Sequence, residues 1–253
     1  MLDSAKKRIW NAALRLAPVP TIVRPRASQF WQSYWRERQQ EGNFPNYAAA
    51  IPLKKWFAHQ IVDLAPASVL ELGCNVGGNL REIGNLNPAI ALYGIELNDR
   101  AIQWGRKNVL PSSAQVFCGS MVDTETILSQ HGINRPDIVF TSAAAMHCDD
   151  TIFSAAKNAA LAVGRKAIIH LELNAWTPAD LYNGQAWRKS FLSDRWIRDY
   201  VSEYEGHPRV SKIETRGIPL KINIMDSIGR MKISDVSALI IVHLNPPDAD
   251  IPS

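Results

Sequence analysis

An acidic residue followed by closely spaced glycines is the part of this sequence best suited to chemistry. Residues 71–79 read ELGCNVGGN. Glycine tolerates a positive φ in a tight turn, and because it lacks a side chain a ligand can lie directly on the backbone amides. About twenty residues later Glu96 ends a second apolar stretch, where its carboxylate would meet the ribose hydroxyls of a nucleoside. The two motifs together predict a nucleoside-binding site.

Two further residues are candidates for catalysis. His147 follows a fourth apolar stretch, and its imidazole could line an acceptor pocket or act as a general base because it titrates near neutrality. Alternatively, it caps or packs against the next helix. Glu172 lies at the carboxyl end of a fifth stretch, where open α/β sheets bind their ligands, although it could equally belong to a polar loop cluster. His170, inside the same apolar stretch, is expected to be a hydrogen-bonded core histidine.

The two motifs resemble those of the class I S-adenosylmethionine-dependent methyltransferase family. That family has an acidic residue, then glycines at alternate positions, then an acidic residue that ends the second strand. The resemblance covers Val69 to Leu173. It implies that Glu71 helps to hold the methionine end of S-adenosylmethionine, that Gly73 and Gly77 shape the turn, and that Glu96 binds the ribose.

The sequence departs from the family pattern at two places. Asn75 stands where the middle glycine usually is, but asparagine tolerates a left-handed backbone, so the turn can still form. Ser120 and Met121 follow the third apolar stretch, where the family commonly has an aspartate that contacts adenine, and the Ser120 hydroxyl could accept that hydrogen bond. The implied cofactor-binding set is therefore Glu71, Gly73, Asn75, Gly77, Glu96, Ser120 and Met121.

The elements that must position these residues alternate between strand and helix patterns. This alternation predicts an α/β fold with a doubly wound, mostly parallel, seven-stranded Rossmann-like sheet. Strands are expected at residues 68–72, 91–97, 114–118, 137–141, 166–173, 210–215 and 238–244. Helices are expected at residues 78–86, 99–108 and 151–163, with a further helical stretch at 181–204.

The front of the chain has a different character. Residues 1–58 are expected to form a helical, aromatic-rich extension or cap, and residues 59–253 the methyltransferase domain. Basic and apolar residues alternate near helical spacing in 4–16, so this segment predicts an amphipathic helix that packs on its own domain or makes peripheral contact with a membrane. The aromatic residues of 30–57 either pack in the core or close over a small-molecule site.

Charge and cysteine usage narrow the class of protein. The 28 basic and 24 acidic residues give a net charge of +4, and the basic residues of the C-terminal part are mixed with acidic ones, so we expect no nucleic-acid partner. Cys74, Cys118 and Cys148 have no paired spacing, which favours a cytoplasmic protein with no structural metal and no disulfides. No apolar run is long enough to span a membrane.

The sequence therefore predicts an S-adenosylmethionine-dependent methyltransferase that transfers a methyl group in line to a small-molecule or saccharide acceptor. One alternative is a nicotinamide-dependent oxidoreductase, although its pyrophosphate needs the glycine that Asn75 replaces. A second alternative is a non-catalytic module that binds S-adenosylmethionine and acts through interaction.

Overall fold

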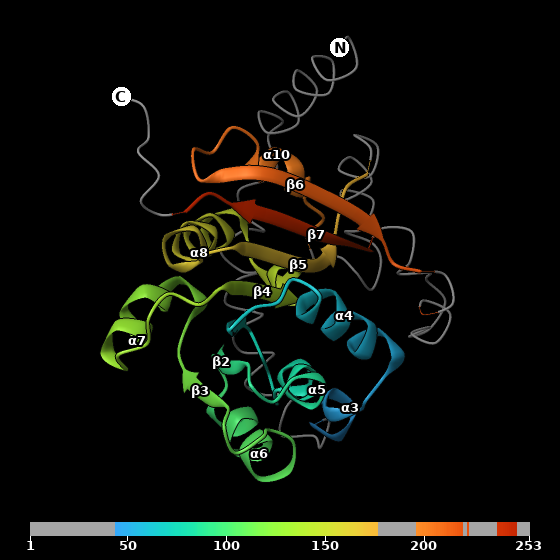
Figure 1. The fold of residues 1–253 in the computed structure, drawn as a ribbon, viewed down its shortest axis with the longest axis vertical. Coiled ribbons are helices and arrows are strands. Elements are labelled where there is room, and N and C mark those ends of the chain that lie inside the picture. Colours follow the sequence, from blue (N-terminus) through green and yellow to red (C-terminus); the bar gives the residue numbers. More distant parts are fainter. Residues whose placement is uncertain (1–43, 177–195, 220–221, 223–236, 247–253) are drawn as a thin grey trace, which may run out of the picture.

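A seven-stranded sheet with the order β3-β2-β1-β4-β5-β7-β6 organises the protein (Figure 1). The computed structural model describes residues 44–176, 196–219, 222 and 237–246. Strands β1 to β5 pair in parallel, whereas β7 runs antiparallel to both of its neighbours, β5 and β6. The strands are β1 (Ser68–Leu72), β2 (Ala91–Glu96), β3 (Gln115–Cys118), β4 (Ile138–Ser142), β5 (Ala167–Leu173), β6 (Val210–Gly217) and β7 (Ser237–Leu244). The predicted mostly parallel, seven-stranded sheet is confirmed.

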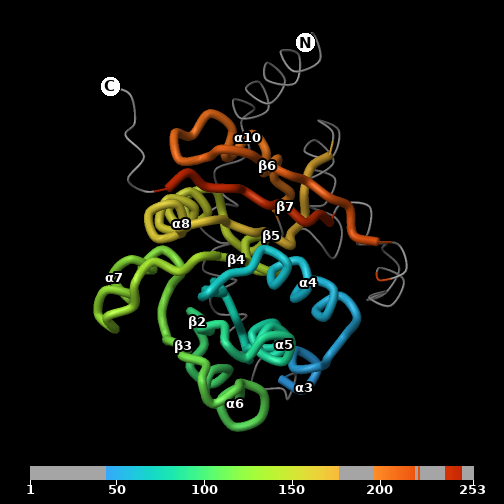
Figure 2. The backbone as a smooth tube through the Cα atoms, in the orientation of Figure 1, coloured from blue at the N-terminus to red at the C-terminus, as the bar shows by residue number. Residues whose placement is uncertain are grey.

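Helices cover both faces of this sheet. They are α3 (Phe44–Ala48), α4 (Pro52–Val62), α5 (Gly78–Leu86), α6 (Asp99–Asn108), α7 (Thr124–Gln130), α8 (Asp150–Val163) and α10 (Tyr200–Tyr204), with short 3-10 turns η2 (Met121–Asp123) and η3 (Ala145–His147). One core cluster joins α4, α5 and α6 to the sheet, and a second joins α7, α8 and α10 to its other face. In Figure 2, α4 and α5 lie to the right of β4 and α7 and α8 lie to its left.

The strand sequences explain why both faces are covered. Along β1, Val69 contributes to the core under α4 and α5, and the next residue, Leu70, contributes to the core under α8. All seven residues of β5 are buried. A parallel strand between two helical layers needs apolar side chains on both faces, so it appears in the sequence as a continuous apolar run.

Helix α4 joins the front of the chain to this core. Phe57, Ala58 and Ile61 are buried, and the Phe57 ring meets the Phe140 ring of β4 edge to face with centroids 5.6 Å apart. The boundary expected at residue 58 falls inside α4. The aromatic residues of this part of the helix therefore pack in the core.

Two expectations for other segments lie wholly or partly outside the described residues. The basic amphipathic helix expected at residues 4–16 is not among them, and of the helical stretch at 181–204 only residues 196–204 are described, with α10 at the end. Within the described ranges, no helix is long and apolar enough to cross a membrane.

Candidate cofactor site

The turn between β1 and α5 has the left-handed backbone that the sequence predicts. Gly73, Asn75 and Gly77 have φ values of 76°, 50° and 80°. The Asn75 side chain supports the turn, because its Oδ1 accepts a hydrogen bond from the Val76 amide at 2.8 Å. The expectation that asparagine can replace the middle glycine of this turn is confirmed.

Glu96, at the end of β2, ties this turn to the next strand. Its Oε2 accepts the Asn75 amide at 2.8 Å and its Oε1 accepts the Asn98 amide at 3.0 Å. Burial raises the pKa of Glu96, while these backbone hydrogen bonds act in the opposite direction. A backbone hydrogen bond from Leu97 also lowers the pKa of Glu96. A carboxylate has about four lone-pair sites, so these backbone donors do not use all of them.

Glu71, on β1, forms a buried polar pair with Asn79 of α5. The Asn79 amide nitrogen donates to Glu71 Oε1 at 2.6 Å, and only 1% of Glu71 is exposed. Among the described residues, neither Glu71 Oε2 nor Asn79 Oδ1 has a hydrogen-bond partner. Burial raises the pKa of Glu71 to about 8 although Asn79 and the charge of Lys54 lower it. Because buried polar atoms nearly always have a hydrogen-bond partner, these two oxygens indicate the position of a polar ligand group.

The loops after β3 and β4 meet the glycine turn. A Cβ atom on Gly73 would lie 2.7 Å from Ala144 Cβ and 3.7 Å from Met121 Cε. Ser120 precedes η2, and its hydroxyl oxygen accepts the Val122 amide at 3.4 Å. The structure therefore brings the carboxyl ends of β1, β3 and β4 together, which is where open α/β sheets bind their ligands.

Glu172 braces the loop between β4 and α8. Its Oε1 accepts the amides of Ala144 and Ala145 at 2.9 Å each, and its Oε2 accepts the Met146 amide at 3.2 Å. Burial raises the pKa of Glu172, and these hydrogen bonds oppose that rise. Because backbone amides donate to both of its oxygens, the Glu172 carboxylate fixes the orientation of this loop.

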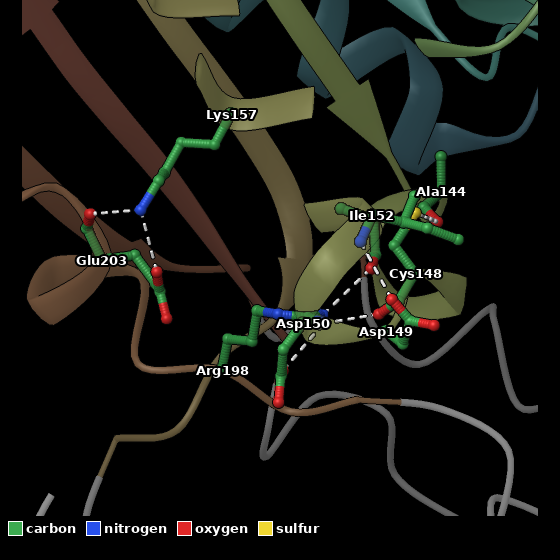
Figure 3. A network of polar contacts seen from close by, with 9 residues as sticks. Ala144, Cys148, Asp149, Asp150, Ile152, Lys157, Arg198 and Glu203 are labelled. Carbon is green, nitrogen blue, oxygen red and sulfur yellow. Dashed lines mark hydrogen bonds and ion pairs between the residues drawn. The ribbon is translucent and has the colours of Figure 1, made fainter. Parts of the chain in front are cut away.

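Arg198 holds the carbonyl groups of the same loop (Figure 3). Its guanidinium donates to the Ala145 carbonyl at 3.1 Å, to the Cys148 carbonyl, and to Asp150 Oδ1 at 3.4 Å. It also lies over the Phe153 ring, 4.4 Å from the centroid. Sequence reasoning missed Arg198, because no motif marks a residue that acts through backbone carbonyls fifty positions away.

The two histidines of the sequence analysis now have positions. His147 is half-buried in η3, within the loop that Glu172 and Arg198 hold. The expectation for His170 is confirmed: its ring nitrogens lie 2.8 Å from Thr141 Oγ1 and from the Tyr204 hydroxyl, and burial lowers its pKa to about 3. It is therefore neutral at pH 7. Asn174, like Glu172, accepts a hydrogen bond from the backbone: its Oδ1 accepts the Tyr200 amide at 3.3 Å.

Among the residues that the structure describes, no group of three or more His, Cys, Asp or Glu side chains could hold a metal ion. The three cysteines are free, and the Cys148 sulfur lies 3.6 Å from the Met121 sulfur. Burial raises the pKa of the Cys148 thiol to about 12, so it stays protonated at pH 7.

Comparison with solved structures assigns the fold. The plantazolicin methyltransferase BpumL in complex with SAH is 16% identical and has a TM-score of 0.58, over 94% of this chain and 99% of that chain. An O-methyltransferase family protein from Burkholderia thailandensis is 13% identical with a TM-score of 0.57, over 78% of this chain, which spans only 56% of that protein. The methyltransferase domain of bacterial CtHen1-CN is 14% identical with a TM-score of 0.53, over 76% of this chain and 97% of that chain.

The chain has a class I methyltransferase fold. No protein-family model and no curated protein matches it. The methyltransferase fold differs from the dinucleotide-binding sheet at one edge, because the antiparallel strand β7 is inserted between β5 and β6, whereas the dinucleotide sheet has the order 3-2-1-4-5-6.

Replacing Gly77 tests the turn itself. At φ 80° a Cβ atom is strained, and it would also lie 2.1 Å from Leu110 Cδ2. We expect Gly77→Ala to lower the free energy of unfolding by about 2 kcal/mol in urea denaturation, and to weaken SAH binding. Gly132→Ala is the matched control, because Gly132 has φ 64° with nothing within 4 Å of its Cβ position. Equal losses in the two variants would show that the contact with Leu110 has no effect.

Proposed function

We propose that this protein is an S-adenosylmethionine-dependent methyltransferase that acts on a small-molecule or saccharide acceptor. The observation that carries the proposal is the hydrogen bond from the Asn75 amide to the Glu96 carboxylate. It joins a left-handed turn, which exposes backbone to a ligand, to an acid that can accept from ribose hydroxyls. The buried oxygens of Glu71 and Asn79 come from the strand and the helix that flank the same turn.

The cofactor fits the donors and acceptors of this edge of the sheet. Glu71 and Asn79 would accept hydrogen bonds from the ammonium of the methionine end, and Glu96 would accept from the ribose. Gly73, Asn75 and Gly77 would present backbone to the cofactor. In the same arrangement, Ser120 and Met121 would lie beside the adenine. When bound, S-adenosylmethionine supplies an electrophilic methyl group on a sulfonium.

The loop between β4 and α8 is the proposed acceptor side of the site. In-line transfer gains most from alignment of the two reactants and exclusion of water, which can lower a barrier by about 7 to 11 kcal/mol. Glu172 and Arg198 hold this loop from its amide and carbonyl sides, so both act as positioning residues. His147 is then the residue of this loop that would face the acceptor and, for a hydroxyl acceptor, take its proton.

The type of acceptor is inferred from charge. Basic residues of the described C-terminal part pair with acids: Lys212 and Arg216 both bind the Glu214 carboxylate, at 2.9 and 2.6 Å. Paired charges of this kind are typical of a solvated surface and disfavour a nucleic-acid-binding surface. A neutral small molecule or a saccharide suits such a surface better than a polyanion does.

A methyl-transfer assay tests this proposal. The protein is incubated with S-adenosylmethionine and a panel of hydroxylated small molecules and saccharides, and methylated products and SAH are measured by mass spectrometry. We expect product with at least one panel member, and at least about 100-fold less in His147→Ala if the acceptor is a hydroxyl. His59→Ala, an exposed histidine on α4, should retain full activity. Tight SAH binding with no product from any member of the panel would contradict the proposed class of acceptor.

A further inference from the structure

Lys54 of α4 lies beside the glycine turn, although no motif of the sequence marks it. A Cβ atom on Gly78, the first residue of α5, would lie 2.9 Å from Lys54 Nζ. The ammonium donates to the carbonyls of Tyr47 and Ala49, the latter at 3.0 Å. Its charge also acts on Glu71, where it lowers the pKa. Lys54 therefore places a positive charge beside the start of α5, where it also acts on the buried acid.

The start of α5 adds to this positive charge. The helix has nine residues, and its N-cap, Gly77, has no side chain to accept hydrogen bonds from the first amides. Such amides and the helix dipole attract an anion. Two kinds of binding group therefore lie close together in this site. Lys54 and the helix N-terminus favour an anion, and the unpartnered oxygens of Glu71 and Asn79 favour a hydrogen-bond donor.

An α-amino acid carries both complementary groups on one carbon atom. We propose that Lys54 binds the carboxylate of the cofactor's methionine moiety, while Glu71 and Asn79 accept hydrogen bonds from its ammonium. This inference rests on the proposed function, and it adds a charged contact from α4 that pairs with the acceptors on β1 and α5. Lys54 would exchange a carbonyl partner for the carboxylate, because a lysine ammonium has three donors on a flexible stem.

A change in protonation should accompany binding. Four groups face the Glu71 carboxyl: Asn79 from α5, Lys54 from α4, Glu96 from β2 and Cys74 in the turn. With a pKa of about 8, Glu71 is mostly protonated at pH 7 in the free protein. A bound ammonium favours the ionised form, so binding releases a proton, and affinity rises with pH between about 6 and 8 by at most tenfold per pH unit.

Calorimetric titration with two ligands tests the role of Lys54. SAH has both the carboxylate and the ammonium, whereas decarboxylated SAH keeps only the ammonium. We expect Lys54→Met to bind SAH about 10- to 100-fold more weakly than the wild type, because it loses a charged hydrogen bond. Decarboxylated SAH should bind Lys54→Met no more weakly than it binds the wild type. Lys55→Met, which removes the exposed neighbouring lysine, should bind both ligands normally.

The outcomes separate this inference from the proposed function. A wild-type protein that does not bind SAH rejects the proposed function itself. A wild-type protein that binds SAH, with Lys54→Met weakening neither ligand or weakening both equally, rejects only the assignment of Lys54. If Lys54→Met does not fold, Lys54→Arg is used instead. This variant should weaken the binding of SAH more than the binding of decarboxylated SAH.

The proton release is measured separately. SAH is titrated at pH 7 in phosphate and in Tris, whose different ionisation enthalpies report the number of protons released. We expect close to one proton from the wild type and none from Glu71→Gln. Equal proton release in Glu71→Gln would overturn the role given to Glu71.

Discussion

Glu96→Ala is expected to weaken SAH binding by at least about 100-fold, because two charged hydrogen bonds to ribose hydroxyls are lost at once. The same substitution removes the acceptor of the Asn75 and Asn98 amides, which hold the turn to β2. The loss therefore has a direct part and a part that comes from a loosened turn. Isothermal titration with SAH measures both together.

Three further variants make that result specific. Glu96→Gln keeps the shape of the side chain but turns its amide NH₂ group toward one of the backbone N–H donors. Its affinity for SAH should therefore fall between those of the wild type and Glu96→Ala. Asp99→Ala, which removes an exposed acid three residues away, should bind SAH normally. His147→Ala should also bind SAH normally, because His147 is placed on the acceptor side. Wild-type affinity in Glu96→Ala would refute the assignment of Glu96 to the ribose.

Arg198→Ala is expected to lower the free energy of unfolding by about 3 kcal/mol. The Arg198 side chain is 5% exposed, and its removal leaves the carbonyls of Ala145 and Cys148 without their donor. Each orphaned buried group costs about 1 to 3 kcal/mol, and the contact with the Phe153 ring is lost as well. Urea denaturation measures the change.

Arg165→Ala is the matched control for this prediction. Arg165 also pairs with an acid, Asp137 at 3.7 Å, but its side chain is 59% exposed. Exposed pairs contribute about 0 to 1 kcal/mol, so this variant should stay close to the wild type. A loss in Arg198→Ala no larger than that in Arg165→Ala would show that the loop does not depend on the guanidinium.

The elements nearest the proposed cofactor site could be predicted from sequence because the residues that mark them lie within or next to each element. The bounds of β1, α5 and α6 match those expected, since an apolar run, a glycine turn and an Asn98 cap mark them. The positive φ at Asn75 followed from the conformational preference of asparagine. Helix α7 was missed, because its seven residues have only three buried side chains to indicate a periodic face.

The contacts that act across long sequence separations could not be predicted in this way. Glu172 was placed correctly at the end of β5, but nothing local indicates that three amides of another loop would occupy its oxygens. The same holds for Arg198, and for Lys54, whose position beside Gly78 follows from how α4 packs on α5. Side-chain partners of this kind depend on the tertiary fold.

The most direct test of the central claim, that this fold holds S-adenosylmethionine, is a parallel calorimetric titration of the wild-type protein with SAH and with NADH. The arrangement of Glu71, Asn75 and Glu96 predicts saturable one-to-one binding of SAH, and binding of NADH that is at least about 100-fold weaker, because Asn75 disfavours a pyrophosphate on the turn. Tighter binding of NADH, or no binding of SAH, would contradict it.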